Sequence, residues 1–176
     1  KMSTKFDYDL IVIGAGSGGV RAARISAGYG AKVAIVEENR PGGTCVLRGC
    51  IPKKFLVYAS QFNEEVRDYK GYGWDVEGLK HDWSRFNKAK NQELDRLAEI
   101  YRNILSNAGC QLFQGKASLK SINSVIVNGK TLTAEKILIA TGGKSFIPND
   151  LASNGLTITS DEALNLKKCP ETIVII

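Results

Sequence analysis

Two cysteines, Cys45 and Cys50, lie five positions apart in a segment rich in glycine and basic residues. In a regular α-helix, Cα atoms at this spacing are about 8 to 9 Å apart, whereas a disulfide needs them within roughly 7 Å. The segment must therefore bend to join the thiols, and Gly49 gives the backbone that freedom. A bridge closed over so short a loop is comparatively easy to reduce, which is typical of a redox-active disulfide.

A lysine follows this pair. Lys53 places a positive charge near Cys50, and a cation beside a cysteine favours the reactive thiolate. The alternative is that Cys45 and Cys50 are unrelated buried thiols and that Lys53 is an ordinary solvated lysine. Cys110 and Cys169 fit no pattern, and for them the interpretation as ordinary thiols is the better one.

A glycine-rich stretch follows the apolar run at 10–13. It reads Gly14-Ala15-Gly16-Ser17-Gly18-Gly19 and fits the G-x-G-x-x-G pattern of dinucleotide sites. Gly14 permits a tight turn, Gly16 lets backbone amides approach a pyrophosphate, and Gly19 allows a helix to pack closely on a strand. The N-terminus of the following helix faces the phosphate charge. The alternative, a turn without a ligand, is disfavoured by this strand-and-helix context.

An acidic residue stands where such a site contacts a ribose. Glu37 follows the second apolar run, about 20 residues beyond the glycines, and is placed to accept a hydrogen bond from a ribose hydroxyl. An acid there disfavours a 2′-phosphate, so we expect FAD or NAD(H) at this site and not NADP(H). Glu38 could be the contact instead, or Glu37 could be an ordinary exposed carboxylate. We prefer Glu37 because it directly follows the apolar run.

The elements that position these residues alternate between strand and helix, as in a βαβ unit of a parallel sheet. In chain order we expect a strand at 9–13, a helix at 17–29, a strand at 32–36, and helices at 51–69 and 82–107. Pro52 falls in the first turn of its helix, where proline is tolerated, and Asp82 is a suitable cap for the next. The glycine-rich stretch 70–80 is expected to be a surface loop.

Shorter strands follow. We expect them at 110–113, 117–119, 124–127, 131–133 and 136–140. Asn128-Gly129 is a strong hairpin signal, and the last strand ends in a second glycine turn, Thr141-Gly142-Gly143. The run 172–176 repeats the apolar character of 10–13 and is expected to be a strand that opens a second βαβ unit.

These elements predict an α/β chain with a Rossmann-like FAD-binding fold: a parallel sheet, helices and a small antiparallel β-meander. We expect residues 1–144 to form the first segment of a FAD-binding domain. Residues 145–176 are then the connection to a truncated NAD(P)H-binding domain and its first strand.

Composition argues against several other classes. The chain has 176 residues, 43% of them hydrophobic, which is enough to bury a core. No apolar run approaches the roughly 20 residues of a membrane helix, and the N-terminal residues are too polar for a signal peptide, so we expect a cytoplasmic protein with mostly reduced cysteines. The net charge of +6 is dispersed and predicts no nucleic-acid site. The single histidine, His81, belongs to no Cys/His cluster, so no metal is predicted.

On these motifs the chain resembles the pyridine nucleotide-disulfide oxidoreductases. The resemblance extends over essentially the whole chain and is carried by Gly14–Gly19, by the cysteine segment Gly43–Lys54, and by Ala140–Gly143. The cysteine segment is the motif most specific to the family. Within the family, the Lys53-Lys54 doublet resembles the glutathione reductases, whereas dihydrolipoamide dehydrogenases usually have serine before a single lysine.

The resemblance implies a homodimeric enzyme that passes electrons from NADPH through FAD and a Cys45–Cys50 disulfide to glutathione disulfide. Cys45 is then the interchange thiol, Cys50 faces the flavin, and Lys53 assists both. The implied FAD contacts are Gly14, Gly16, Ser17, Gly18, Gly19, Glu37, Gly43, Thr44, Cys45, Cys50, Lys53, Lys116, Ala117, Thr141 and Gly142. The implied substrate contacts are Ser17, Arg24 and Tyr101, with Arg24 at the position that meets a glutathione carboxylate.

Family members run to roughly three domain-lengths of chain. The resemblance therefore implies that the second glycine motif, the NADPH-binding arginines, the interface domain and the partner subunit's acid/base histidine lie outside these residues. Two alternatives stay open: the chain is a flavin-binding module without turnover, or the parent enzyme reduces another disulfide, as dihydrolipoamide dehydrogenases do. The choice between NADPH and NADH is also open.

Overall fold

The computed structural model describes residues 6–152 and 155–176, and the chain divides into two compact units. Unit 1 comprises Lys1–Leu47 and Arg96–Lys144, and unit 2 comprises Arg48–Asp95 and Ser145–Ile176. Unit 1 ends at the predicted domain boundary, but unit 2 also takes in residues 48–95, so the predicted division into domains stays a prediction. Within the described residues, no helix is long and apolar enough to cross a membrane.

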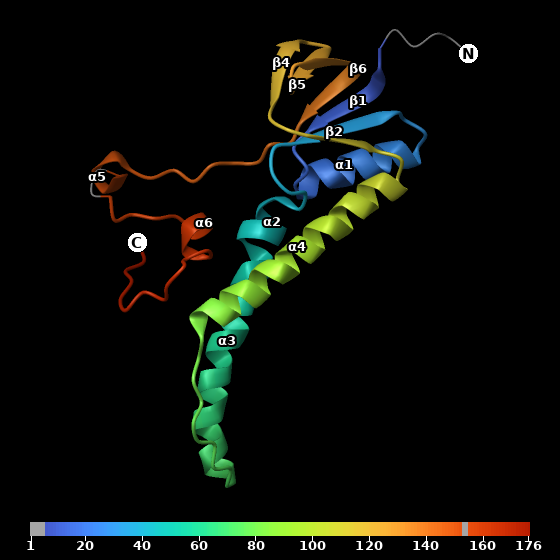
Figure 1. Ribbon diagram of the computed structural model, residues 1–176. Helices are drawn as coiled ribbons and strands as arrows, with labels where there is room; N and C mark the ends of the chain where they lie inside the picture. The colour runs from blue at the N-terminus through green and yellow to red at the C-terminus, as the bar shows by residue number, and fades with distance from the viewer. Residues whose placement is uncertain (1–5, 153–154) are drawn as a thin grey trace. The chain divides into compact units, whose positions relative to one another are not determined.

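Unit 1 is built on a six-stranded sheet in the order β3-β2-β1-β6-β5-β4 (Figure 1). The strands are β1 (Tyr8–Ile13), β2 (Val33–Glu37), β3 (Gln111–Gln114), β4 (Ala117–Ser121), β5 (Ser124–Val127) and β6 (Lys130–Ile139). β1 pairs in parallel with β2 and β6, and β2 pairs in parallel with β3. β4, β5 and the start of β6 form the antiparallel meander, so the predicted Rossmann-like fold is confirmed.

The two strands expected at 131–133 and 136–140 are wrong as separate elements, because β6 is one continuous strand of 10 residues. Its first part pairs with β5 through Lys130–Thr133, and from Ala134 onward it pairs with β1. No glycine or proline interrupts it, so nothing forces a turn between the two pairings. The predicted hairpin before it is confirmed, since Asn128 (φ 48°) and Gly129 (φ 75°) both have the positive φ of a type I′ turn.

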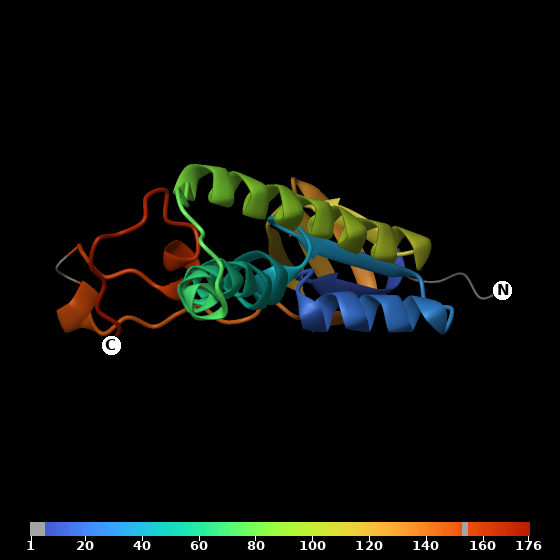
Figure 2. The same ribbon diagram turned by 90° about the horizontal axis from the view of Figure 1, so that it is seen from below.

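Alternate residues of the central strands point to opposite faces of the sheet, and each face has its own hydrophobic cluster. On one face Ile11 and Val36 pack with the meander residues Val125 and Val127. On the other face the buried cluster draws on β1, β2, helix α1 (Ser17–Gly28) and the C-terminal part of helix α4 (Trp83–Asn107), and it comprises Val12, Ala15, Val20, Ala23, Val33, Ile35, Leu105 and Cys110. Figure 2 shows α1 and this part of α4 running along the sheet.

Outside the sheet, the remaining elements are α2 (Gly43–Arg48), α3 (Cys50–Tyr69), the 3₁₀-helix η1 (Lys70–Tyr72), α5 (Asn149–Ala152) and α6 (Ser160–Ala163). α2 was not expected from the sequence. The predicted cap of α4 is confirmed, since Asp82 Oδ1 accepts the Arg85 N–H at 3.0 Å. The strand expected at 172–176 is not formed in the described chain, where Ile173–Ile176 are exposed. A strand needs a hydrogen-bonded neighbour, and none of the described strands pairs with this segment.

Cys110 lies in the cluster beneath α1, where it is 7% exposed. Burial raises the pKa of its thiol, which leaves less thiolate at neutral pH. We therefore expect Cys110 in the native protein to react with iodoacetamide at least about tenfold more slowly than the exposed Cys169. Mass spectrometry of the alkylated peptides over time measures both rates. Equal rates in the folded protein would contradict this account of Cys110.

Candidate functional site

Three backbone segments of unit 1 meet at the carboxyl ends of its parallel strands. The Gly14 N–H donates to Val36 O at 2.7 Å, so the glycine turn is fastened to the end of β2. The Gly42 N–H donates to Ala15 O at 2.9 Å, and the Ala140 N–H donates to Ile13 O at 2.8 Å. The loop after β2 thus joins the glycine turn, and the turn after β6 begins beside the end of β1, at the edge where open α/β sheets bind their ligands.

The approach of these segments is close enough that only glycine fits at several positions. A Cβ on Gly14, whose φ is +103°, would lie 2.4 Å from Ala140 O. A Cβ on Gly19 would lie 1.9 Å from Gly14 O, and one on Gly43 would lie 2.5 Å from Gly16 Cα. By contrast, a Cβ on Gly16 would meet nothing nearer than Gly43 Cα at 3.6 Å, an ordinary contact. The fold therefore does not demand glycine at Gly16, whereas a phosphate brought against the backbone there would.

Helix α1 directs its N-terminus into this junction. Its N-cap is Gly16, no side chain caps the helix, and its first turn carries no acidic residue. Ser17 and Gly18 are exposed at that end. The first N–H groups of a helix have no intrahelical acceptor, so they and the helix dipole suit an anion such as a pyrophosphate.

Glu37 ends β2 beside the glycine turn. Its Oε2 accepts the Ala15 N–H at 2.7 Å, and its Oε1 accepts the Asn39 N–H at 2.8 Å. A carboxylate offers about four lone-pair sites, so the half-buried Glu37 retains capacity for a ribose hydroxyl. Glu38 is exposed. The ribose contact of Glu37 stays a prediction.

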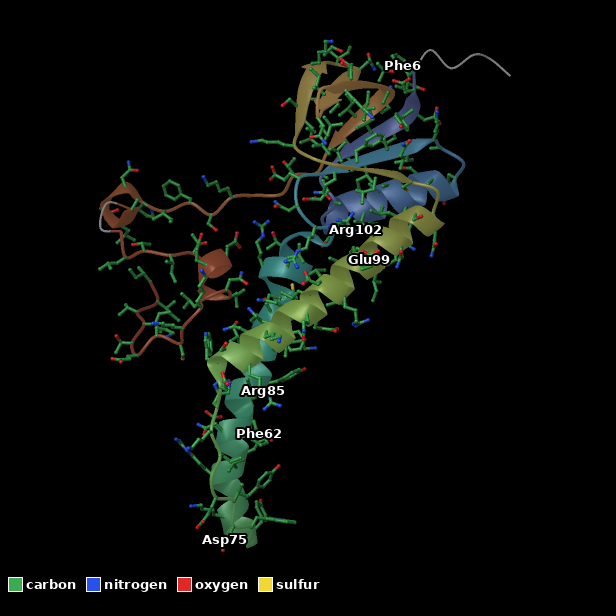
Figure 3. The ribbon with its side chains drawn as sticks, in the orientation of Figure 1. Phe6, Phe62, Asp75, Arg85, Glu99 and Arg102 are labelled. Carbon is green, nitrogen blue, oxygen red and sulfur yellow. The ribbon has the colours of Figure 1, made fainter. Side chains whose placement is uncertain are left out.

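Hydrogen bonds that the sequence did not predict fix the loop that begins at Glu37. Gln114 donates from Nε2 to the backbone oxygens of Glu37 (3.0 Å) and Asn39 (2.6 Å). Arg102 on α4 donates from Nη2 to Gln114 Oε1 at 3.2 Å and forms an ion pair with Glu99 at 3.7 Å (Figure 3). The Gln114 contacts join residues 75 and 77 positions apart and belong to no motif, so no local pattern could have predicted them.

The cysteine segment bends between Cys45 and Cys50, as the five-residue spacing of the two thiols requires. α2 carries Cys45 and ends at Arg48, and α3 begins at Cys50. Between them Gly49 has φ −147° and ψ −108°, outside the helical region, so the predicted bend is confirmed. Cys45 is half-buried and Cys50 is exposed. The pairing of these thiols, and which of them faces a flavin, stay predictions.

The two lysines that follow differ in their surroundings. Lys53 and Lys54 are both exposed in the first turns of α3, and the Lys53 N–H donates to Gly49 O at 3.0 Å. The Lys54 ammonium lies 5.7 Å from the centre of the Tyr58 ring on the same helix, a cation–π contact. The role of Lys53 beside the cysteine pair stays a prediction.

The remaining predicted residues fall into two groups. Lys116 follows Gly115, whose N–H donates to Glu37 O at 2.8 Å, and Thr141 follows Ala140, so both lie next to the junction. Ala117 packs against the meander cluster. Arg24 is exposed on α1, and Tyr101 is half-buried against the cluster beneath that helix. None of the described hydrogen bonds joins either residue to the glycine turn. In the described residues, no group of three His, Cys, Asp or Glu could hold a metal ion.

Comparison with known proteins agrees with this geometry. Residues 8–176 match the family model described as pyridine nucleotide-disulphide oxidoreductase. The chain is 49% identical to a glutathione reductase of Burkholderia cepacia, over 98% of the chain and 38% of the relative. It is 44% identical to the chloroplastic/mitochondrial glutathione reductase of Pisum sativum, over 98% and 33%. It is also 37% identical to a dihydrolipoyl dehydrogenase of Acholeplasma laidlawii, over 97% and 52%. The chain thus spans from a third to about half of these relatives' lengths.

Proposed function

Because the chain belongs to the pyridine nucleotide-disulphide oxidoreductase family, we propose that it is the flavin-binding part of a disulfide reductase that passes electrons from NADPH to glutathione disulfide. The observation that carries the proposal is the packing of the cysteine segment on the glycine turn. A Cβ on Gly43 would lie 2.5 Å from Gly16 Cα, a backbone atom that cannot move aside. Cys45 follows Gly43 by two positions. A redox-active thiol and a dinucleotide site thus share one stretch of backbone.

FAD fits the donors at this junction. The uncapped amides at the start of α1 and the space at Gly16 suit its pyrophosphate, and Glu37 suits a ribose hydroxyl. Further contacts are proposed at Gly14, Ser17, Gly18, Gly19, Gly43, Thr44, Lys53, Lys116, Ala117, Thr141 and Gly142. When bound, FAD supplies a two-electron relay between a nicotinamide and a disulfide.

The chemistry of the chain's own residues is thiol–disulfide exchange. Two electrons and a proton open the Cys45–Cys50 bond to a thiolate and a thiol. The Cys45 thiolate attacks one sulfur of glutathione disulfide, forms a mixed disulfide and releases one glutathione thiolate, which takes up a proton. Cys50 gives up its proton and attacks the Cys45 sulfur as a thiolate, which restores the internal disulfide and releases the second glutathione as a thiolate that takes up a proton. Lys53 stabilises the Cys50 thiolate by its charge.

Glutathione as the substrate rests on Arg24 and on the relatives. An exposed guanidinium on α1 can bind a glutathione carboxylate with charge-assisted hydrogen bonds. In the full-length enzyme we therefore expect Arg24→Ala to raise the KM for glutathione disulfide about tenfold with little change in kcat. Steady-state kinetics measure both constants. Arg21→Ala, an equal truncation of an exposed arginine on the same helix, is the control, and an equal KM in both variants would contradict the assignment.

A second candidate function is reduction of a different disulfide, favoured by the 37% identity to a dihydrolipoyl dehydrogenase. Comparing the rates of the full-length enzyme with glutathione disulfide and with lipoamide separates the two. The proposed enzyme is a homodimer, with its acid/base histidine supplied by the partner subunit. If the 176-residue chain by itself reduced glutathione disulfide with NADPH, the assignment of these parts to other residues would be wrong.

A further inference from the structure

Unit 2 holds a polar cluster that the proposed mechanism does not use. Trp83, Asn87 and Lys90 follow one another at helical spacing along one face of α4. Trp83 Nε1 and Asn87 Nδ2 both donate to Leu166 O, at 2.8 and 3.2 Å, and Lys90 Nζ donates to Leu164 O at 2.5 Å. Three side chains of one helix therefore hold two backbone carbonyls of a segment more than 70 residues away in sequence.

Lys90 makes this contact in an unusual setting, since it is only 2% exposed. Lysine is rarely buried so fully, because removing an ammonium from water is costly unless it finds acceptors. The burial also lowers the pKa of Lys90. Its acceptor, Leu164 O, lies at the C-terminal end of the short helix α6, where backbone carbonyls lack intrahelical partners. The hydrogen bond to this carbonyl therefore offsets part of the cost of burying the lysine.

The other end of the same segment is also fixed. Thr159 and Glu162 form a capping box at the start of α6, in which the Thr159 N–H donates to Glu162 Oε2 at 2.8 Å. Asp161 in this first turn pairs with Arg48, with Nη1 and Oδ2 3.3 Å apart. Arg48 stands two positions before Cys50, between the two thiols in the sequence. Thr159–Leu166, named the latch below, is thus tied both to α4 and to the cysteine segment.

We propose that the latch sets where the chain leaves the flavin-binding part, with Lys90 and Asp161 as positioning residues for the delivery of electrons to the Cys45–Cys50 pair. This inference rests on the proposed function. Residues beyond Leu166 lead into the apolar run that we assign to the NADPH-binding part. The contacts of the latch with α4 and with Arg48 keep these residues in place. The NADPH-binding part, which supplies the electrons, is thereby positioned to deliver them toward the Cys45–Cys50 pair. Loosening the latch slows that delivery and leaves thiol–disulfide exchange with glutathione unchanged.

The test uses Lys90→Met and Asp161→Asn in the full-length flavoprotein. Lys90→Met keeps a similar volume but removes the donor, and Asp161→Asn removes the ion pair at a partly exposed site where folding is not at risk. In rapid mixing with NADPH, we expect flavin absorbance to bleach roughly fivefold more slowly in each variant, because small misplacements of reacting groups are costly. The rate of reduction by excess glutathione, which enters through the thiols, should stay as in the wild type.

Matched controls are Lys88→Met, an exposed lysine on the same helix, and Glu171→Gln, an exposed carboxylate outside the latch. Both should behave as the wild type, Asp161→Glu should recover most of the bleaching rate, and Lys90→Met should be cleaved faster by protease within 155–168. If NADPH bleached the flavin at the wild-type rate in both Lys90→Met and Asp161→Asn, the proposed role of the latch would be wrong while the proposed function would stand. If the wild type itself did not bleach with NADPH, the proposed function would fall, and the latch with it.

Discussion

Cys50→Ser in the full-length flavoprotein is expected to lower NADPH-dependent reduction of glutathione disulfide by roughly 10³-fold or more, because neither the internal disulfide nor its regeneration is then possible. FAD should still bind, since the glycine turn, Glu37 and the uncapped end of α1 are untouched. Steady-state rates and the ratio of flavin to polypeptide measure the two effects separately. Cys50 is exposed, so the loss of one sulfur should not destabilise the fold.

Cys169→Ser is the matched control, because Cys169 is equally an exposed cysteine but belongs to no predicted site. It should retain full activity. If Cys50→Ser kept more than a small residual rate while Cys169→Ser lost activity, the assignment of the redox pair would be wrong. Loss of flavin along with activity in Cys50→Ser would instead show that this residue acts through cofactor binding.

The second large effect is a difference between Gly19 and Gly16 of the glycine motif when each is replaced by alanine. Gly19→Ala is expected to destabilise the protein by about 3 kcal/mol, because its Cβ would stand 1.9 Å from Gly14 O and 3.3 Å from Val12 Cγ1, and the nearer atom is backbone that cannot move aside. Gly16→Ala should change the free energy of unfolding by less than about 1 kcal/mol, since its Cβ finds ordinary contact, yet it should weaken FAD binding about tenfold or more.

Denaturant unfolding without flavin and titration with FAD give the two quantities. Gly28→Ala is the control, because Gly28 lies at the far end of α1, where a Cβ would meet nothing within 4 Å. It should bind FAD normally and gain a few tenths of a kcal/mol from helix propensity. Equal loss of stability in Gly16→Ala and Gly19→Ala would show that the motif serves packing alone and would remove the argument for a phosphate at Gly16.

Local rules predicted much of this molecule. Asp82 as a cap, the bend at Gly49 and the hairpin at Asn128-Gly129 each follow from the conformational preferences of a few neighbouring residues. The parallel pairing of β1 with β2 follows from the order of strand, helix and strand in a βαβ unit. In these cases the residues that determine the structure are themselves close in sequence or governed by topology.

The features that the sequence did not predict depend on contacts between residues far apart in the chain. The continuity of β6 depends on its pairing with β5 on one side and β1 on the other, which no window of its own sequence reveals. Gln114 and Lys90 hold backbone carbonyls of remote segments, and a carbonyl acceptor leaves no trace in residue type. The apolar run at 172–176 has strand composition but no described partner, and composition alone does not make a strand.

The central claim is that Cys45 and Cys50 form one redox couple fed by NADPH. Anaerobic alkylation of the full-length flavoprotein before and after addition of NADPH, read by peptide mass spectrometry, tests it most directly. We expect both thiols to be protected in a shared disulfide beforehand and both to be alkylated afterwards, while the labelling of Cys169 does not change. Thiols already open before NADPH, or a disulfide that survives complete bleaching of the flavin, would contradict it.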